Sequence, residues 1–323
     1  MAKLRISIVQ YLNTAPLVWG FTNGSLHGKY ELSFTVPSQC AEALRSGAAD
    51  VAIIPAIEYQ RIENLVVLPD LAIASKRRVR SLLLLAKKPM QQVRRMALDR
   101  SSRSTQALTR ILCAEHWKIA PDFVEADPDL GAMLRDADAA LLIGDPALRL
   151  ALQFQSARTN PLLGGPECTC EGFRIGLPQI PTLHLYDVVE EWRKLTNLPA
   201  VLALWAGRKE IVNEDVVADF QLSRDMGLQR LDEISERAAN ELALPAAQLK
   251  RYLAENIDFT LDEENLRGLT AYFVQSFRMG LIPAVSTIAI AAARNKPVRY
   301  MDFAFAKEDQ GPGLSTVAYV HKS

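Results

Sequence analysis

The sequence lacks several features that mark particular classes of protein. Lys plus Arg and Asp plus Glu both number 37 in 323 residues, so the formal net charge is zero. This balance argues against non-specific binding to nucleic acid, which needs a surplus of basic groups. No stretch reaches the roughly 18–20 consecutive apolar residues that span a bilayer. Residues 1–17 also lack the apolar core and cleavage site of a signal peptide. We therefore expect a cytoplasmic protein that binds neither nucleic acid nor membrane.

Residues and motifs that hold metals or nucleotides are also scarce. The chain has four cysteines and four scattered histidines. Cys168 and Cys170 form a C-x-C pair, but no second pair of ligands lies nearby in the sequence, as a zinc site would require. Neither of the glycine-rich motifs that cradle phosphates is present. We predict no metal and no cofactor.

The patterns that are present predict an α/β fold. Residues 30–36 alternate strictly between apolar and polar, as a half-buried strand does. Residues 51–55 form a continuous apolar run, typical of a parallel strand that is buried on both faces. Between them, Ser38 is predicted to cap a short helix that stops at Gly47. With a first strand at residues 4–8, this β-α-β-α-β order indicates a doubly wound lobe.

The length of the chain suits about two domains rather than one core. Residues 81–85 predict a further strand, after which the chain leaves the first lobe. We predict a first lobe of residues 1–88 with 203–284, largely helical after Asn213, and a second lobe of residues 89–202. Residues 285–323 are predicted to form an appended helix, a loop and a short strand. Two such α/β lobes predict an interlobe cleft.

In open sheets of this kind, ligands bind beyond the carboxyl ends of the strands. The first strand ends before Asn13 and the third before Glu58, while the exit strand begins at Ser81. In the second lobe, a strand leads to Gly144 and Asp145. Asn13 could instead be a turn residue and Asp145 a helix cap. We therefore predict that these residues approach a ligand, with both alternatives open.

The most informative segment carries four hydroxyl groups where a helix is predicted to begin. They belong to Ser101, Ser102, Ser104 and Thr105. A helix N-terminus exposes unpaired N–H groups and the positive end of the helix dipole, which together bind anions. Ordinary N-capping would need only one of these hydroxyls. We therefore predict a carboxylate-binding turn.

Seven segments, in order over about residues 4–280, closely resemble the chorismate dehydratases, which open the futalosine route to menaquinone. They are YLNTAPL, PSQCAEALRSGAADVAIIPAIEY, VRSLLLLAKKP, ALDRSSRS, ALLIGDPAL, YDVVEEW and TNLPAVLALWA. The resemblance implies a type II periplasmic-binding-protein fold with the substrate in the interlobe cleft. It also implies that Asn13 and Ser81 are the active-site Asn and Ser. Ala56 stands where the family usually has a serine.

The reaction that this resemblance implies is a dehydration of chorismate to 3-[(1-carboxyvinyl)oxy]benzoate. Loss of the ring hydroxyl and of the proton on the ether-bearing carbon makes the ring aromatic, so neither metal nor redox cofactor is required. Asn13 and Ser81 are not effective bases, and the proton must go to Glu58, to Asp145 or to a carboxylate of the substrate. We favour the substrate carboxylate, because the family's matching residues are not bases.

Two other functions remain as alternatives. One is a non-catalytic binding protein or sensor for small carboxylates with the same fold. Such a protein would be expected to carry an export signal or a DNA-binding helix-turn-helix. The other is the sister enzyme dihydroxynaphthoate synthase, whose first turn differs from YLNTAPL. The sequence leaves the oligomeric state open.

Overall fold

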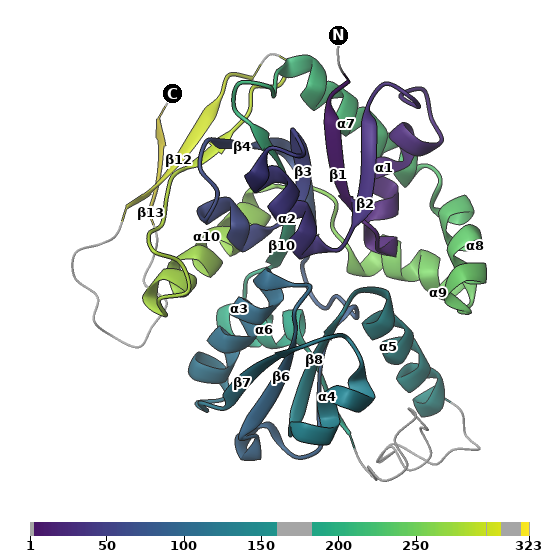
Figure 1. Ribbon diagram of the computed structural model, residues 1–323, viewed down its shortest axis with the longest axis vertical. Coiled ribbons are helices and arrows are strands. Elements are labelled where there is room, and N and C mark those ends of the chain that lie inside the picture. Colours follow the sequence, from purple (N-terminus) through teal and green to yellow (C-terminus); the bar gives the residue numbers. More distant parts are fainter. Residues whose placement is uncertain (1–2, 160–182, 295, 305–317, 323) are drawn as a thin grey trace.

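The computed structural model describes residues 3–159, 183–294, 296–304 and 318–322, and Figure 1 shows two lobes, one above the other. Among these residues the strands form two sheets. The larger sheet contains, in spatial order, β13 (Ala318–Lys322), β12 (Arg299–Ala304), β11 (Ile288–Ile290), β4 (Leu65–Ser75), β10 (Ala200–Arg208), β3 (Val51–Pro55), β1 (Arg5–Val9) and β2 (Glu31–Thr35). The smaller sheet contains β7 (Asp122–Ala126), β6 (Arg95–Asp99), β8 (Ala139–Ile143), β5 (Leu82–Ala86) and β9 (His184–Asp187).

Both sheets are mixed rather than purely parallel. In the larger sheet β1 pairs in parallel with β2 and β3, whereas β10 runs antiparallel to β3 and β4. In the smaller sheet β6 is parallel to β7 and β8, whereas β5 is antiparallel to β8 and β9. The expected α/β architecture of two lobes is confirmed, with antiparallel strands added to each parallel core.

Helices cover both sheets (Figure 1). Those of the upper lobe are α1 (Ala15–Thr22), α2 (Pro37–Ser46), α7 (Glu214–Leu228), α8 (Leu231–Leu242), α9 (Ala246–Arg251) and α10 (Glu263–Arg278). Those of the lower lobe are α3 (Arg103–Ile111), α4 (Leu130–Asp136), α5 (Gly144–Thr159) and α6 (Val188–Thr196). Five single turns complete the described elements: η1 (Leu12–Thr14), η2 (Ala56–Gln60), η3 (Met90–Gln92), η4 (Leu112–His116) and η6 (Tyr252–Asn256). No helix in the described part of the chain is long and apolar enough to cross a bilayer.

Strand β5 shows how the core is divided. Its side chains alternate between the two faces of the smaller sheet, as strand geometry requires. Leu82, Leu84 and Ala86 belong to the main buried cluster, which continues into the larger sheet. Leu83 and Leu85 belong to a second cluster, on the face that α4 and α5 cover. Because both faces are buried, the strand reads as an unbroken apolar run.

Three sequence-based expectations about this fold were wrong. Strand β5 pairs with β8 and β9 in the smaller sheet, so the chain leaves the larger sheet between Ser75 and Leu82, not after residue 88. Ser38 does not cap α2, because Val36 occupies the cap position and Pro37 begins the helix, although Gly47 does end it at φ +75°. Finally, residues 288–290 form strand β11 rather than a helix.

The C-terminal residues extend the larger sheet. β11 pairs in parallel with β4, and β12 and β13 follow as antiparallel neighbours. The loop expected near residue 311 lies outside the described residues. At the other end of the sheet, β2 is the expected strand at residues 30–36, but it is an edge strand. The expected half-burial of this strand was wrong, because Leu32 is only partly buried and Phe34 is 46% exposed. Alternation indicates a strand but does not show whether another element covers its apolar face.

Candidate functional site

A cavity of about 50 Å³ lies between the two sheets. Its wall is built from the carboxyl ends of β1, β3 and β8, together with parts of β4, β5 and β10. The polar groups that line it belong to Tyr11, Asn13, Ser102 and Thr105, and the backbone of Gly144 completes this side. The site thus lies where the strand-end rule for open sheets expects a ligand.

Asn13 reaches the cavity from η1, directly after β1. Its side chain is almost fully buried, and the residue is 9% exposed. Thr14 Oγ1 donates to Asn13 Oδ1 over 3.4 Å. The amide NH₂ therefore remains as a donor, so Asn13 can hydrogen-bond an oxygen atom of a ligand.

Ser81 lies immediately behind the cavity wall, one residue before Leu82, and is 1% exposed. Its backbone carbonyl accepts from Gly144 N–H over 2.8 Å, and its Oγ accepts from Tyr252 Oη over 2.9 Å. The preceding Arg80 has φ +64°, a conformation that side chains with a Cβ rarely adopt. Asp187 holds this backbone in place by accepting from Arg80 N–H over 2.6 Å. Ser81 is therefore held rigidly from several directions.

The hydroxyl-rich turn contributes two of its four predicted side chains to the cavity. Ser102 is at the cap position of α3, yet it makes no side-chain capping bond. Instead, Ser102 Oγ donates to Thr105 Oγ1 over 2.8 Å, and both residues line the cavity. The cavity therefore meets the N-terminus of α3, whose N–H groups and helix dipole favour an anion.

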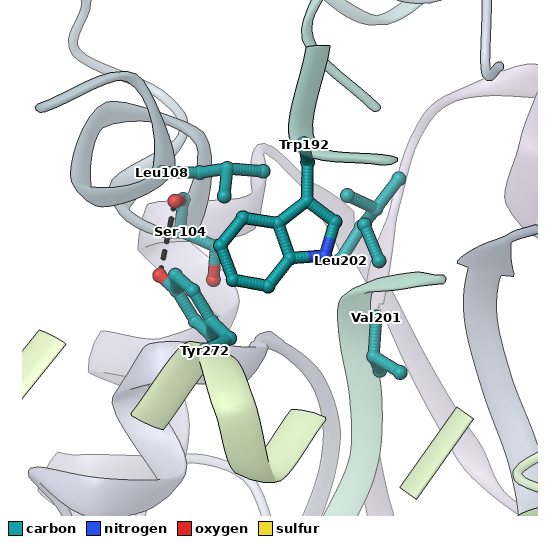
Figure 2. A pocket seen from close by; sticks show the side chains of 7 residues that line it. Ser104, Leu108, Trp192, Val201, Leu202 and Tyr272 are labelled. Carbon is teal, nitrogen blue, oxygen red and sulfur yellow. Dashed lines mark hydrogen bonds between the residues drawn. The ribbon is translucent and has the colours of Figure 1, made fainter. Parts of the chain in front are cut away.

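The hydroxyls of Ser101 and Ser104 hold this turn in place. Ser101 Oγ donates to Asp99 over 2.6 Å, and Ser104 Oγ accepts from Ile57 N–H over 3.1 Å. Figure 2 shows the other contact of Ser104, whose carbonyl accepts from Tyr272 Oη over 3.0 Å. The small cavity in that view measures about 10 Å³, at the lower limit for one water molecule. Neither serine lines the main cavity.

Gly144 and Asp145 lie at the start of α5, where the two lobes touch. Gly144 has φ +68°, and a Cβ there would come within 2.7 Å of the Tyr11 ring, so only glycine fits. Asp145 accepts from Leu12 N–H over 3.1 and 3.3 Å, and burial raises the pKa of its carboxyl to about 6. This carboxylate ties the smaller sheet to the turn that carries Asn13, and it does not line the cavity.

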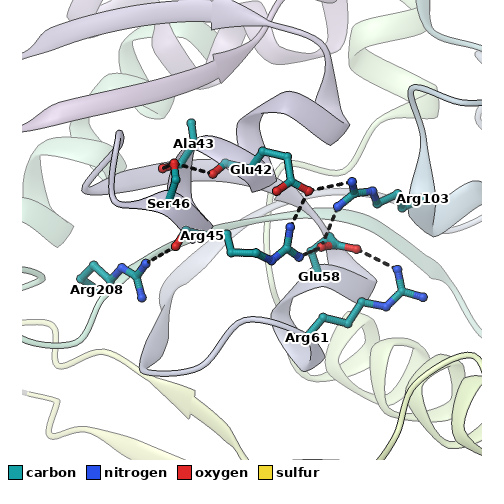
Figure 3. Close-up of polar contacts among 8 residues, drawn as sticks. All are labelled: Glu42, Ala43, Arg45, Ser46, Glu58, Arg61, Arg103 and Arg208. Atoms are coloured by element: carbon teal, nitrogen blue, oxygen red, sulfur yellow. Dashed lines mark hydrogen bonds and ion pairs between the residues drawn. The ribbon is translucent and has the colours of Figure 1, made fainter.

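Glu58, the other carboxylate that we considered as a proton acceptor, lies in an ion-pair cluster (Figure 3). Its side chain is fully buried and contacts the guanidinium groups of Arg45, Arg61 and Arg103, the last two over 2.8 and 3.1 Å. Arg103 belongs to α3 of the lower lobe and also contacts Glu42 of α2 over 2.7 Å. The cluster therefore connects the two lobes, and Glu58 does not line the cavity.

The cavity can orient and hydrogen-bond a ligand, but its described lining supplies no Asp, Glu, His, Lys, Arg or Cys side chain. Burial raises the pKa of the Tyr11 phenol, which therefore keeps its proton near neutral pH. In the described part of the chain, His, Cys, Asp and Glu nowhere gather in threes that could hold a metal ion. Cys168 and Cys170 lie outside the described residues.

Sequence reasoning missed two tyrosines near the predicted catalytic pair. Tyr11 lines the cavity and begins the segment YLNTAPL, so its position two residues before Asn13 was a signal that could have identified it. Tyr252 contacts Ser81 from 171 residues away. At Tyr252 the sequence shows only an apolar helical spacing with Leu249 and Leu253, which indicates packing.

Two mixed α/β lobes that enclose a cavity define a periplasmic-binding-protein-like fold. Three solved structures support this class. An Archaeoglobus fulgidus protein from a structural genomics consortium has a TM-score of 0.66 and 17% identity, over 87% of this chain and 98% of that one. The aliphatic sulphonate binding protein of Escherichia coli has a TM-score of 0.56 and 16% identity, over 97% of both chains. A Candida albicans protein described as having the generic periplasmic binding protein fold has a TM-score of 0.58 and 13% identity, over 88% and 92%.

Within this class the chain belongs to the menaquinone biosynthesis family, whose model matches residues 4–277. A curated relative, the chorismate dehydratase of Thermus thermophilus, is 26% identical over 280 residues. The aligned region covers 83% of this chain and 93% of that protein. The predicted fold is confirmed, and the predicted pathway is confirmed at the level of the family.

Proposed function

We propose that this protein dehydrates chorismate to 3-[(1-carboxyvinyl)oxy]benzoate. The proposal is supported by membership of the menaquinone biosynthesis family and by the similarity to a chorismate dehydratase. One observation of the structure carries it further. The cavity combines neutral hydrogen-bonding groups with a helix N-terminus, and its described lining offers no general base.

Such a site suits a substrate that carries its own base. Chorismate has two carboxylates, a ring hydroxyl and an enol ether on a cyclohexadiene ring. The C–H bond at the ether-bearing carbon breaks, and its electron pair forms the new ring double bond as the C–O bond to the hydroxyl breaks. The proton passes to a substrate carboxylate, and the hydroxyl leaves as hydroxide. The hydroxide then takes up this proton, so the products are the aromatic acid and water. Aromatisation supplies the driving force, and the protein supplies orientation.

Each polar group of the site then has a role that its chemistry allows. The N-terminus of α3, with the hydroxyls of Ser102 and Thr105, would bind one carboxylate. The amide of Asn13 would hold the substrate and donate to its oxygens. The hydroxyl of Ser81 would stabilise the leaving hydroxide by hydrogen bonding.

The two protein carboxylates do not suit the role of base. Glu58 is held by three guanidinium groups and does not line the cavity, so it cannot reach a ligand there. Asp145 uses both oxygens to accept from the backbone of Leu12. We therefore assign the proton to the substrate.

The test is incubation of the purified protein with chorismate as the sole added compound, followed by absorbance and mass spectrometry. We expect an aromatic product that has lost one water. Asn13→Ala should lose most of this activity, whereas Asn23→Ala, a matched change on the exposed end of α1, should retain it. Binding of chorismate without water loss would indicate a binding protein instead. Conversion of a different intermediate of menaquinone synthesis, with chorismate untouched, would indicate another enzyme of the family.

A further inference from the structure

Tyr252 is a buried tyrosine whose hydroxyl contacts a residue of the proposed catalytic pair. It begins η6, in the helical part of the upper lobe, and is 1% exposed. Its Oη donates to Ser81 Oγ over 2.9 Å. Ser81 belongs to the segment that enters the smaller sheet, so this hydrogen bond crosses from one lobe to the other.

The hydrogen bond determines where the proton of Ser81 can point. A serine hydroxyl has one proton and two lone pairs. Because Tyr252 donates into one lone pair, the Ser81 proton has to be donated in a different direction. Ser81 is adjacent in sequence to Leu82 and is bonded through its carbonyl to Gly144, and both of these residues line the cavity. The Ser81 hydroxyl therefore lies close to the cavity wall, and donation toward the cavity is compatible with the hydrogen bond from Tyr252.

Tyr252 can act as this donor at every working pH. Burial raises the pKa of its phenol far above the ordinary value, so the hydroxyl keeps its proton. Asn13 has a small opposite effect on the same pKa, so both members of the proposed catalytic pair lie near this phenol.

We propose that Tyr252 is a positioning residue that orients the Ser81 hydroxyl as a donor toward the substrate. This inference rests on the proposed function, because it assigns Ser81 to the leaving hydroxyl of chorismate. A tyrosine that served only for packing would contribute its ring, and its hydroxyl would be dispensable. The hydroxyl alone therefore separates the two roles.

The experiment compares wild type, Tyr252→Phe, Ser81→Ala and the double variant in chorismate turnover. Tyr252→Phe should lower kcat by about 10-fold with KM unchanged, a smaller loss than the about 10²–10³-fold expected when a direct donor is removed. In the Ser81→Ala background the same change should have no further effect, because Tyr252 acts through Ser81. Effects that multiply in the double variant would overturn the inference.

Tyr59→Phe is the matched control. Tyr59 is also buried, and its hydroxyl accepts from Ala289 N–H over 2.8 Å, away from the cavity. Its loss should lower stability and leave kcat unchanged. If Tyr252→Phe does not fold, 3-fluorotyrosine at position 252 keeps the hydroxyl and makes it a stronger donor. Our inference then requires a change in kcat at constant KM, and identical kinetics would refute it.

The same data separate the two proposals. Wild-type protein that does not convert chorismate contradicts the proposed function, and the inference fails with it. Wild-type protein that converts chorismate, with Tyr252→Phe equally active, contradicts the inference alone.

Discussion

Glu58 and Glu42 offer a direct measurement of how burial changes the value of an ion pair. Both carboxylates contact Arg45 and Arg103 (Figure 3). The Glu58 side chain is 0% exposed and the Glu42 side chain is 43% exposed. The substitutions Glu58→Gln and Glu42→Gln remove one charge each and keep the shape of the side chain. The two sites differ in burial and in Arg61, which contacts Glu58 alone.

The expected cost of each substitution follows from the charges left behind. Removing one partner of a buried ion pair typically costs about 3–5 kcal/mol. The side chains of Arg45, Arg61 and Arg103 are 32–35% exposed, so water partly compensates their charges. We therefore expect Glu58→Gln to lower the free energy of unfolding by about 2–3 kcal/mol. For the exposed Glu42→Gln we expect about 0–1 kcal/mol.

The assay is urea unfolding, followed in parallel by circular dichroism and tryptophan fluorescence so that coincident transitions establish a single step. Because both carboxylates hold Arg103 of α3 and the Glu58 contact is the buried one, Glu58→Gln should weaken chorismate binding more than Glu42→Gln. Equal losses of stability in the two variants would refute the reasoning, since burial would then have no effect.

Three further predictions concern the site. Asn13→Asp should lower kcat by about 10²–10³-fold, because it removes an amide donor and adds a charge beside a dianion. The control Asn23→Asp should leave kcat unchanged. Wild-type activity in Asn13→Asp between about pH 6 and 8 would show that position 13 serves as a base. Ser102→Ala should weaken chorismate binding in calorimetry by about 1–3 kcal/mol, and an unchanged Kd with an intact fold would reduce the turn to a helix start. Burial raises the pKa of Asp145 from 3.8 to about 6, so the folded protein binds more protons than the unfolded chain and its stability falls as the pH rises through this window. Asp145→Asn removes this titration. The free energy of unfolding of the variant minus that of wild type should therefore rise by about 1–3 kcal/mol between about pH 4 and about pH 6. A difference that stays constant with pH would contradict the assignment.

The sequence by itself determined the local structure and the family. The apolar run at residues 51–55 forms β3, and Gly47 ends α2 in a left-handed conformation, because both signals depend only on neighbouring residues. The strand-end rule led to Asn13 and to the turn at Ser102 and Thr105 for the same reason. The ordered motifs over about residues 4–280 indicated an enzyme family of menaquinone biosynthesis, and the model of that family matches residues 4–277.

Only the tertiary structure decided which segments meet. The apolar run at residues 82–86 predicts a strand, but nothing in its sequence determines which strands it pairs with. In the structure this strand, β5, pairs with β8 and β9 of the smaller sheet. Glu58 follows a strand end as a ligand-binding residue would, yet three arginines from distant segments surround it. Tyr252 looks like a core residue of a helix, and it meets Ser81 from 171 positions away. Strand period and helix caps are properties of a few consecutive residues, whereas burial, pairing and hydrogen-bond partners depend on contacts that only the folded chain creates.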